Sequence, residues 1–137
     1  MTSEAEPREK LRAAGFRVTR TRLIIGHRLW NGPDSRHVDV AALHTDIQAS
    51  GEKVSLATIY NTLRDFERAG LIRRIAVASD RIWYDTDTGN HHHFHDMSEN
   101  RLFDVPGASR EPHSLPEPPD GYRITKVDTL FHLEKVR

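Results

Sequence analysis

The spacing of apolar residues along the chain predicts four helices in its first half. Apolar side chains recur every three or four positions in segments that span residues 4–14, 19–30, 37–49 and 56–69. Gly15, Gly51 and Gly70 follow three of these segments and predict their C-terminal ends, because glycine readily adopts the backbone conformation that closes a helix. Thr19 and Ser55 precede two of the segments and predict N-caps.

The fourth predicted helix has an apolar stripe, Leu56, Ile59, Leu63 and Phe66, that is expected in the core. Its other face holds hydroxyl, amide and guanidinium groups, the side-chain types that contact phosphates and base edges of DNA. Three arginines at the start of the second helix also suit a phosphate backbone, although a solvated basic face explains them equally well. The candidate DNA contacts are Arg17, Arg20, Arg22, Ser55, Thr58, Tyr60, Asn61 and Arg64.

A hairpin is predicted after the fourth helix, because two strand-like segments, 71–77 and 81–85, flank the turn at Ala78-Ser79-Asp80. A helix, a turn, a second helix and a two-stranded wing form the layout of a winged-helix DNA-binding domain. In that layout the fourth helix lies in the major groove and the wing lies against the backbone. A small α/β domain with no ligand is the plainer alternative.

The last third of the chain is predicted to be mostly strand. Residues 91–97 and 101–105 form a predicted hairpin, residues 106–119 contain five prolines and predict a loop, and residues 122–136 have a strand-like pattern. So few strands cannot build a self-sufficient core, so we expect this part to pair with a second copy of the chain. The predicted fold class is α+β, with a winged-helix domain at 1–85 and a small β-rich dimerisation domain at 86–137.

Charge and composition refine this division. Residues 1–84 carry 14 Lys and Arg against 10 Asp and Glu, whereas residues 85–137 carry 6 against 10, which favours a nucleic-acid partner for the first part. No stretch approaches the roughly 20 apolar residues of a membrane span, and the first residues do not begin a signal peptide. We therefore expect a cytoplasmic protein with no membrane partner. The sequence has no cysteine, which excludes disulfides and thiolate zinc sites.

The most unusual segment is His91-His92-His93-Phe94-His95, with four imidazoles in five residues. On a strand, His91, His93 and His95 would point to one side and His92 to the other. Neutral imidazoles beside carboxylates suit Fe²⁺, Mn²⁺ or Zn²⁺, and haem iron is an alternative. An affinity-tag remnant fits poorly, because the run is internal and is interrupted by Phe94.

Several segments together resemble the ferric uptake regulator family: Gly15–Thr19 with Arg22, His37-Val38, Val54–Leu63, Ala69–Ile72 and the His91 cluster. The stretch from Ser55 to Leu63, Ser-Leu-Ala-Thr-Ile-Tyr-Asn-Thr-Leu, is the most specific of them. Further segments are similar to the iron response regulator subgroup: Asp85-Thr86-Asp87, His91–Phe94, Leu115–Tyr122 and Val127-Asp128. The resemblance to that subgroup implies a dimeric repressor that responds to iron and haem.

The resemblance also implies site residues. The family's regulatory metal site would fall on His37, Asp85, His91, His93 and Asp104. A second metal or haem site would use His92 and Glu111. The family's structural-zinc cysteines are absent, with Asp96 and Glu99 near where one pair would fall, so no four-cysteine zinc site is expected.

The function implied by the resemblance is that of a homodimeric transcriptional repressor of iron or haem homeostasis genes. It would not be an enzyme, and it would bind double-stranded DNA at an inverted repeat. A peroxide-sensing, metal-dependent repressor is the alternative within the family. A small non-haem iron enzyme or a metal-binding protein is the alternative outside it, since two histidines and a carboxylate form an oxygenase-like site. Neither outside alternative explains the polar face of the fourth helix.

Overall fold

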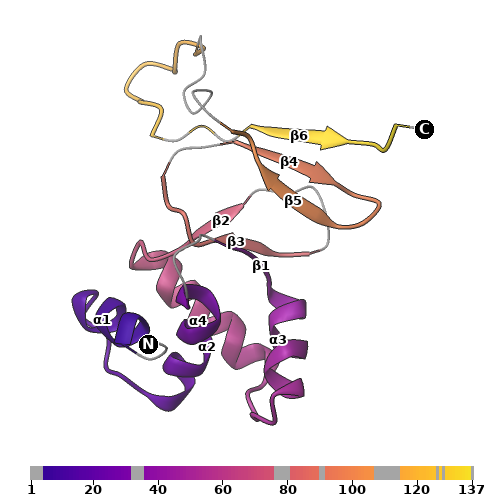
Figure 1. Ribbon diagram of the computed structural model, residues 1–137. Helices are drawn as coiled ribbons and strands as arrows, with labels where there is room; N and C mark the ends of the chain where they lie inside the picture. The colour runs from indigo at the N-terminus through magenta and orange to yellow at the C-terminus, as the bar shows by residue number, and fades with distance from the viewer. Residues whose placement is uncertain are drawn as a thin grey trace. The chain divides into compact units, whose positions relative to one another are not determined.

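The structure, a computed structural model, describes residues 5–31, 36–75, 81–89, 92–106, 115–125, 127 and 129–136. The chain divides into a first unit, Met1–Thr88, and a second unit, Gly89–Arg137. The first unit contains α1 (Ala5–Ala13), α2 (Arg20–Trp30), β1 (His37–Asp39), α3 (Val40–Ala49), α4 (Leu56–Arg68), β2 (Arg73–Ile75) and β3 (Trp83–Asp85). The second unit contains β4 (His93–Asp96), β5 (Arg101–Asp104) and β6 (Leu130–Leu133) (Figure 1). This mixture of helices and sheets confirms the predicted α+β class.

The predicted helix boundaries are set by local hydrogen bonds. The Thr19 hydroxyl accepts from the Arg22 amide at 3.2 Å, and the Ser55 hydroxyl accepts from the Thr58 amide at 3.1 Å, so both are N-caps as predicted. Gly70, which follows α4, has a φ of +79°, a backbone conformation that residues other than glycine rarely adopt. Local sequence therefore determines where α2 begins and where α4 begins and ends.

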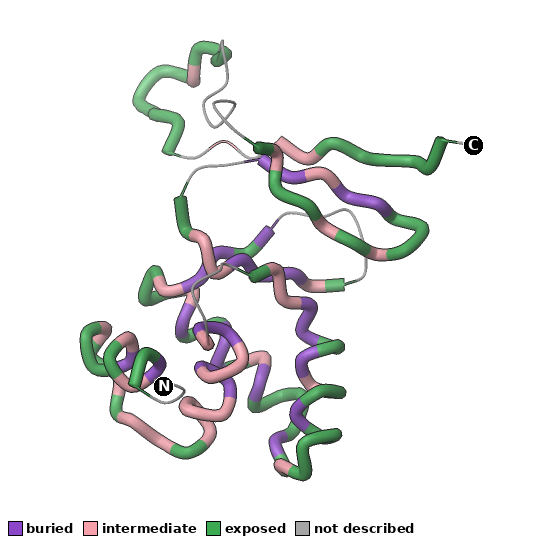
Figure 2. The backbone as a smooth tube through the Cα atoms, viewed as in Figure 1, coloured by how far each residue is buried: buried purple, intermediate pink, exposed green. Residues whose placement is uncertain are grey.

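The core of the first unit is built around Phe66 of α4. Its ring is fully buried and lies 5.2 Å from Trp30 and 5.4 Å from Phe16, measured between ring centroids. Buried positions follow one face of each helix, as the purple segments in Figure 2 show. The prediction that Leu56 belongs to this core is wrong, because Leu56 is 47% exposed. It is the first residue of α4, and Thr62 instead joins the buried face further along the helix.

Residues 37–39 form a strand rather than the predicted start of the third helix. β1 pairs with β3, which also pairs with β2, in an antiparallel sheet of order β1-β3-β2. Asp39 is the N-cap of α3, and its carboxylate accepts from the Ala41 amide at 3.0 Å. The helical spacing of Val40, Leu43 and Ile47 is real and belongs to α3, but the residues before Val40 pair with a distant strand and lie outside the helix.

The second unit is a three-stranded sheet of order β5-β4-β6 (Figure 1). β4 and β5 form the predicted antiparallel hairpin, and β6 pairs with β4 in parallel. Of the strand predicted over residues 122–136, the described part that pairs is Leu130–Leu133. Phe94 and Phe131 lie on one face with ring centroids 5.7 Å apart. Among the described residues, no helix is both long and apolar enough to cross a membrane.

Phe66→Ala should lower the free energy of unfolding by about 3–5 kcal/mol, because it removes a fully buried ring and leaves a cavity. Leu56→Ala is the matched control and should cost less than about 0.5 kcal/mol, since Leu56 is half exposed. Denaturant unfolding of the full chain, followed by tryptophan fluorescence, measures both. Equal losses in the two variants would contradict this description of the core.

Candidate metal centre

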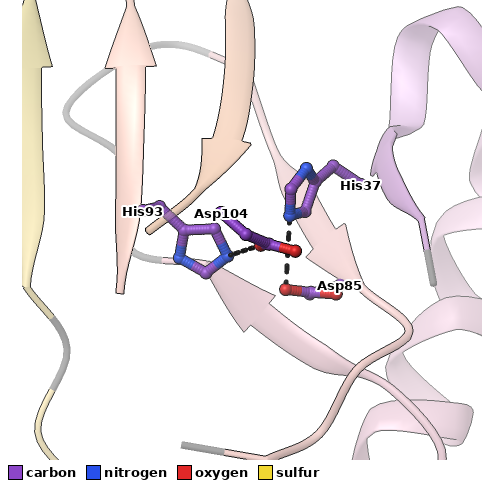
Figure 3. A group of neighbouring side chains, drawn as sticks. All are labelled: His37, Asp85, His93 and Asp104. Atoms are coloured by element: carbon purple, nitrogen blue, oxygen red, sulfur yellow. Dashed lines mark ion pairs between the residues drawn. The ribbon is translucent and has the colours of Figure 1, made fainter. Parts of the chain in front are cut away.

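A first histidine–aspartate pair lies across strands β1 and β3. His37 and Asp85 are directly opposite each other in the antiparallel register. The His37 Nε2 atom lies 3.5 Å from a carboxylate oxygen of Asp85 (Figure 3). The Asp85 side chain is buried and that of His37 is 17% exposed. Opposed positions on paired strands hold their Cβ atoms about 4.5–5.5 Å apart, so short polar side chains converge there.

Two further groups stabilise the buried carboxylate of Asp85. Its Oδ1 atom accepts a hydrogen bond from the Asp87 amide at 2.8 Å. On the other side of β3, the register places Arg73 of β2 opposite Asp85. Burial lowers the pKa of Arg73, and the negative charges of Asp85 and Asp87 act against that shift. Arg73 therefore offsets part of the cost of a buried carboxylate, a role that the sequence analysis missed and that only the strand register reveals.

A second histidine–aspartate pair lies across strands β4 and β5. His93 and Asp104 are also direct register partners. The His93 Nε2 atom lies 3.5 Å from a carboxylate oxygen of Asp104, and the Asp104 side chain is 43% exposed while that of His93 is 5% exposed (Figure 3). This pair thus has one buried and one solvent-facing member.

The donor atoms of both pairs fit a transition-metal ion. Each of the four side chains offers one ligand atom, an imidazole nitrogen or a carboxylate oxygen. Two ligand atoms about 2.1 Å from a tetrahedral ion lie about 3.4 Å from each other, close to the nitrogen–oxygen separation within each pair. Such mixed nitrogen and oxygen donors suit zinc, iron or manganese and do not select one of them.

His92, predicted for a second metal or haem site, has a buried side chain with a different partner. Its Nδ1 atom accepts a hydrogen bond from the Thr129 amide at 3.2 Å. In a neutral imidazole the proton then lies on Nε2, so neither nitrogen offers a free lone pair. His92 would have to give up this bond to become a ligand. The other predicted ligands His91 and Glu111 lie outside the described residues.

His95 is more deeply buried than His92 or His93, with 1% of its surface exposed. Within the part of the chain that the structure describes, neither of its ring nitrogens has a hydrogen-bond partner. A buried polar group left in this state costs about 1–3 kcal/mol. The parallel register of β4 and β6 places His132 beside it, with ring centroids 6.5 Å apart. The histidine run placed His95 on the same predicted strand face as His91 and His93, but nothing in the sequence links His95 to His132 before the strands pair.

The candidate DNA contacts of α4 occupy its outer face. Thr58, Asn61 and Arg64 are exposed, and Tyr60 is partly buried. Tyr60 and Arg64 border a shallow surface depression that Glu67, Arg68 and Arg74 also line. Ser55 is exposed as well, although its hydroxyl already caps the helix.

Two of the three arginines predicted to meet phosphates have partners within the chain. Arg20 contacts both carboxylate oxygens of Glu52, at 2.7 and 3.0 Å. Arg22 donates to the Arg17 carbonyl at 2.9 Å, and its guanidinium lies 5.1 Å from the centre of the Phe16 ring. These contacts hold the arginine side chains in place at the start of α2.

Comparison with known sequences finds ferric uptake regulation proteins among the relatives of this chain. The model of the ferric uptake regulator family matches residues 13–112. A ferric uptake regulation protein from Pseudomonas fluorescens is 32% identical over 96 residues, which are 69% of this chain and 77% of that protein. The Shigella flexneri protein of the same name is 36% identical over 85 residues, which are 62% of this chain and 56% of that protein. The chain thus spans little more than half the length of several of these curated relatives.

Comparison with solved structures gives a similar fold. The ferric uptake regulator from Pseudomonas aeruginosa with manganese has a TM-score of 0.69 at 23% identity, covering 96% of this chain and 98% of that one. The regulator from Francisella tularensis with iron has a TM-score of 0.68 at 19% identity, covering 88% and 92%. Because the family model matches well over half of its residues, the chain belongs to the ferric uptake regulator family.

Proposed function

We propose that this chain is a metal-responsive transcriptional repressor that binds DNA as a homodimer. The observation that carries the proposal is the presence of two cross-strand histidine–aspartate pairs, each with the nitrogen–oxygen separation that suits one ion. Membership of the ferric uptake regulator family supports the regulatory role.

In this proposal the two pairs close on a single divalent ion, Fe²⁺, Mn²⁺ or Zn²⁺. His37 and Asp85 come from the first unit, His93 and Asp104 come from the second, and His91 is the fifth proposed ligand. The bound ion would supply a cross-link between the units. The buried Asp85 is held by the Asp87 amide, so its oxygen is already oriented for a cation. A coupling of about 1–3 kcal/mol between metal and DNA binding would change DNA affinity about 5- to 150-fold.

The first unit is the proposed winged-helix DNA-binding domain. In that layout α4 enters the major groove and the β2–β3 hairpin is the wing. Thr58, Asn61 and Arg64 are exposed along α4, which supports their role as contacts to DNA. Arg17, Arg20 and Arg22 would meet phosphates. Arg20 would have to break its contact with Glu52 to reach a DNA phosphate, and the loss of that contact would reduce the gain in binding free energy.

The second unit is the proposed dimerisation domain. β5 and β6 are the edges of its sheet, and edge strands expose unpaired backbone groups. Phe103, Phe131 and Leu133 lie on these edge strands and are 37%, 46% and 39% exposed. Contiguous exposed apolar side chains mark surfaces that bind another protein. A second copy of the chain would cover them and create the two-fold symmetry that matches an inverted repeat.

His93→Ala and Asp104→Asn should each weaken Mn²⁺ binding at least tenfold, because each removes a proposed ligand. His37→Ala, in the other unit, should do the same. His44→Ala is the matched control, since His44 is a partly buried histidine of α3 that belongs to neither pair. Equilibrium dialysis of the full chain measures the affinities. If His37→Ala binds Mn²⁺ as tightly as the wild type while His93→Ala does not, the ion does not join the two units.

Arg64→Ala should weaken binding to a selected DNA duplex by about 1–3 kcal/mol and relax discrimination at one base pair, if Arg64 contacts a base edge. Arg12→Ala, an exposed arginine of α1, should leave affinity within about 0.5 kcal/mol. Electrophoretic titration with duplexes selected from a random pool measures both. Equal losses on selected and random duplexes would assign Arg64 to a phosphate instead.

We further propose haem as the physiological ligand. The resemblance to the iron response regulator subgroup implies such a ligand. His92, His93 and His95 provide imidazoles and the chain has no cysteine, so ligation by one or two histidines is the available chemistry. These rings are buried, so haem binding requires a local rearrangement of β4. Peroxide sensing at a bound iron is the alternative within the family.

A haem titration followed by absorbance should give a saturable histidine-ligated spectrum with wild-type protein and should lower its DNA affinity. The variant with His91, His92 and His93 all changed to Ala should lose that spectrum. An unchanged spectrum in the variant, or haem-loaded wild type that binds DNA as tightly as the apo form, would leave the metal ion as the sole signal.

A further inference from the structure

Three phenylalanines form a row across the sheet of the second unit. Phe94 of β4 is the register partner of Phe103 on β5 and of Phe131 on β6, so the three side chains lie on one face. The rings of Phe94 and Phe131 have centroids 5.7 Å apart. At the two ends of this phenylalanine row, Phe103 is 37% exposed and Phe131 is 46% exposed. The row is therefore an apolar strip that another segment can cover.

A cation lies at the β5 end of the phenylalanine row. The guanidinium of Arg101 is 4.8 Å from the centre of the Phe103 ring, and the Arg101 side chain is 59% exposed. Glu99 lies 3.7 Å from Arg101 but also accepts a hydrogen bond from Lys135. Asp96, the register partner of Arg101, is buried and accepts a hydrogen bond within its own turn. Arg101 thus presents positive charge to solvent beside an aromatic ring.

Residues 115–125, here called the proline arm, contain neither helix nor strand. Every residue of the arm except Pro118 is exposed (Figure 2). Its two largest apolar side chains are Leu115 and Tyr122, which are 52% and 75% exposed. Solvent-exposed apolar side chains on a segment of this kind are available to a binding partner.

Local chemistry restricts the conformations of the proline arm. Its three prolines each fix their own φ near about −65° and disfavour a helical conformation at the residue before them. After the last of them, the Tyr122 amide donates to the Pro119 carbonyl at 3.0 Å. Gly121 has a φ of +84° at the third position of this turn, where glycine is favoured. An arm that is ordered before it binds loses little conformational entropy on binding.

The proline arm and the phenylalanine row have complementary chemistry. Two prolines three residues apart, as at Pro116 and Pro119, are the spacing with which proline-rich segments bind grooves lined by aromatic side chains. The arm also carries two carboxylates, Glu117 and Asp120, before Tyr122. These carboxylates suit the exposed guanidinium of Arg101. The prolines of the arm thus match the aromatic rings of the row, and its negative charges match the cation beside them.

The proline arm does not cover the phenylalanine row of its own copy, since Tyr122 and Phe131 both remain exposed in the single chain. We propose that in the homodimer the proline arm of each copy lies across the phenylalanine row of the other. This inference rests on the proposed homodimer and names the segment that closes its interface. The exchange is reciprocal, as two-fold symmetry requires. It buries Tyr122 of one copy against Phe131 of the second copy.

Sedimentation equilibrium of the full chain measures the dimer dissociation constant. Tyr122→Ser and Phe131→Ser should each raise it about tenfold or more, because each removes a ring from the centre of the interface. Tyr122→Phe keeps the ring and should stay within about twofold of the wild type. Val136→Ser is the matched control and should also stay within about twofold, since Val136 is 96% exposed and belongs to neither surface.

A photo-cross-linker tests which surface the proline arm meets. An unlabelled chain with p-benzoylphenylalanine in place of Tyr122 is allowed to exchange subunits with ¹⁵N-labelled wild type and is then irradiated. Cross-links should join the unlabelled arm to ¹⁵N peptides that contain Phe103 or Phe131. Cross-links confined to one copy would overturn the inference. A Tyr122→Ser dimer as tight as the wild type would also overturn it and would leave direct packing of the two sheets.

Failure of the proposed homodimer gives a different result. In that case the wild type itself sediments as a monomer at every concentration, while it still binds Mn²⁺ and DNA. The exchange of arms would then be refuted together with the homodimer. A wild-type dimer that forms without the arm refutes the exchange alone.

Discussion

The cross-strand register is the constraint on which the polar centres of this chain depend. Backbone hydrogen bonds between β1 and β3 fix His37 opposite Asp85, and those between β4 and β5 fix His93 opposite Asp104. A shift of one residue in either pairing would turn every side chain of that strand to the other face of its sheet. The histidine and the aspartate of each pair therefore need no flexible loop to bring them together. Their short side chains leave little conformational freedom to lose when an ion binds.

The buried charge of Asp85 constrains its neighbours in turn. An isolated carboxylate in the core of the first unit would be strongly destabilising. The sheet reduces this destabilisation by placing His37 on one side of Asp85 and Arg73 on the other. A cation bound near His37 would compete with the charge of Arg73 for the same carboxylate. At the proposed site, the affinity for metal would thus depend on how firmly Arg73 is held in β2, the strand that follows α4.

The same register also separates two kinds of histidine in the second unit. His93 and His95 occupy one face of β4, but their cross-strand neighbours differ: Asp104 for the first, Leu102 and His132 for the second. The two histidines therefore have different surroundings, although they are only two residues apart on one strand.

The sequence by itself determined the features that depend on neighbours along the chain. The N-caps at Thr19 and Ser55, the glycine ends of the helices, the β4–β5 hairpin and the polar outer face of α4 all follow from side chains within a few residues of each other. The absence of cysteine likewise restricted any metal ligands to histidine, carboxylate and water. These features are local interactions or matters of composition, so they can be predicted from the residue types without knowledge of the fold.

Only the tertiary structure decided the rest. It made residues 37–39 a strand, exposed Leu56, placed Arg73 beside Asp85 and brought His132 to His95. Each of these outcomes depends on hydrogen bonds or packing between segments far apart in the chain. Short segments with ambiguous apolar spacing have no preference strong enough to resist such pairing, so their conformation and partners are set by the sheet that they join.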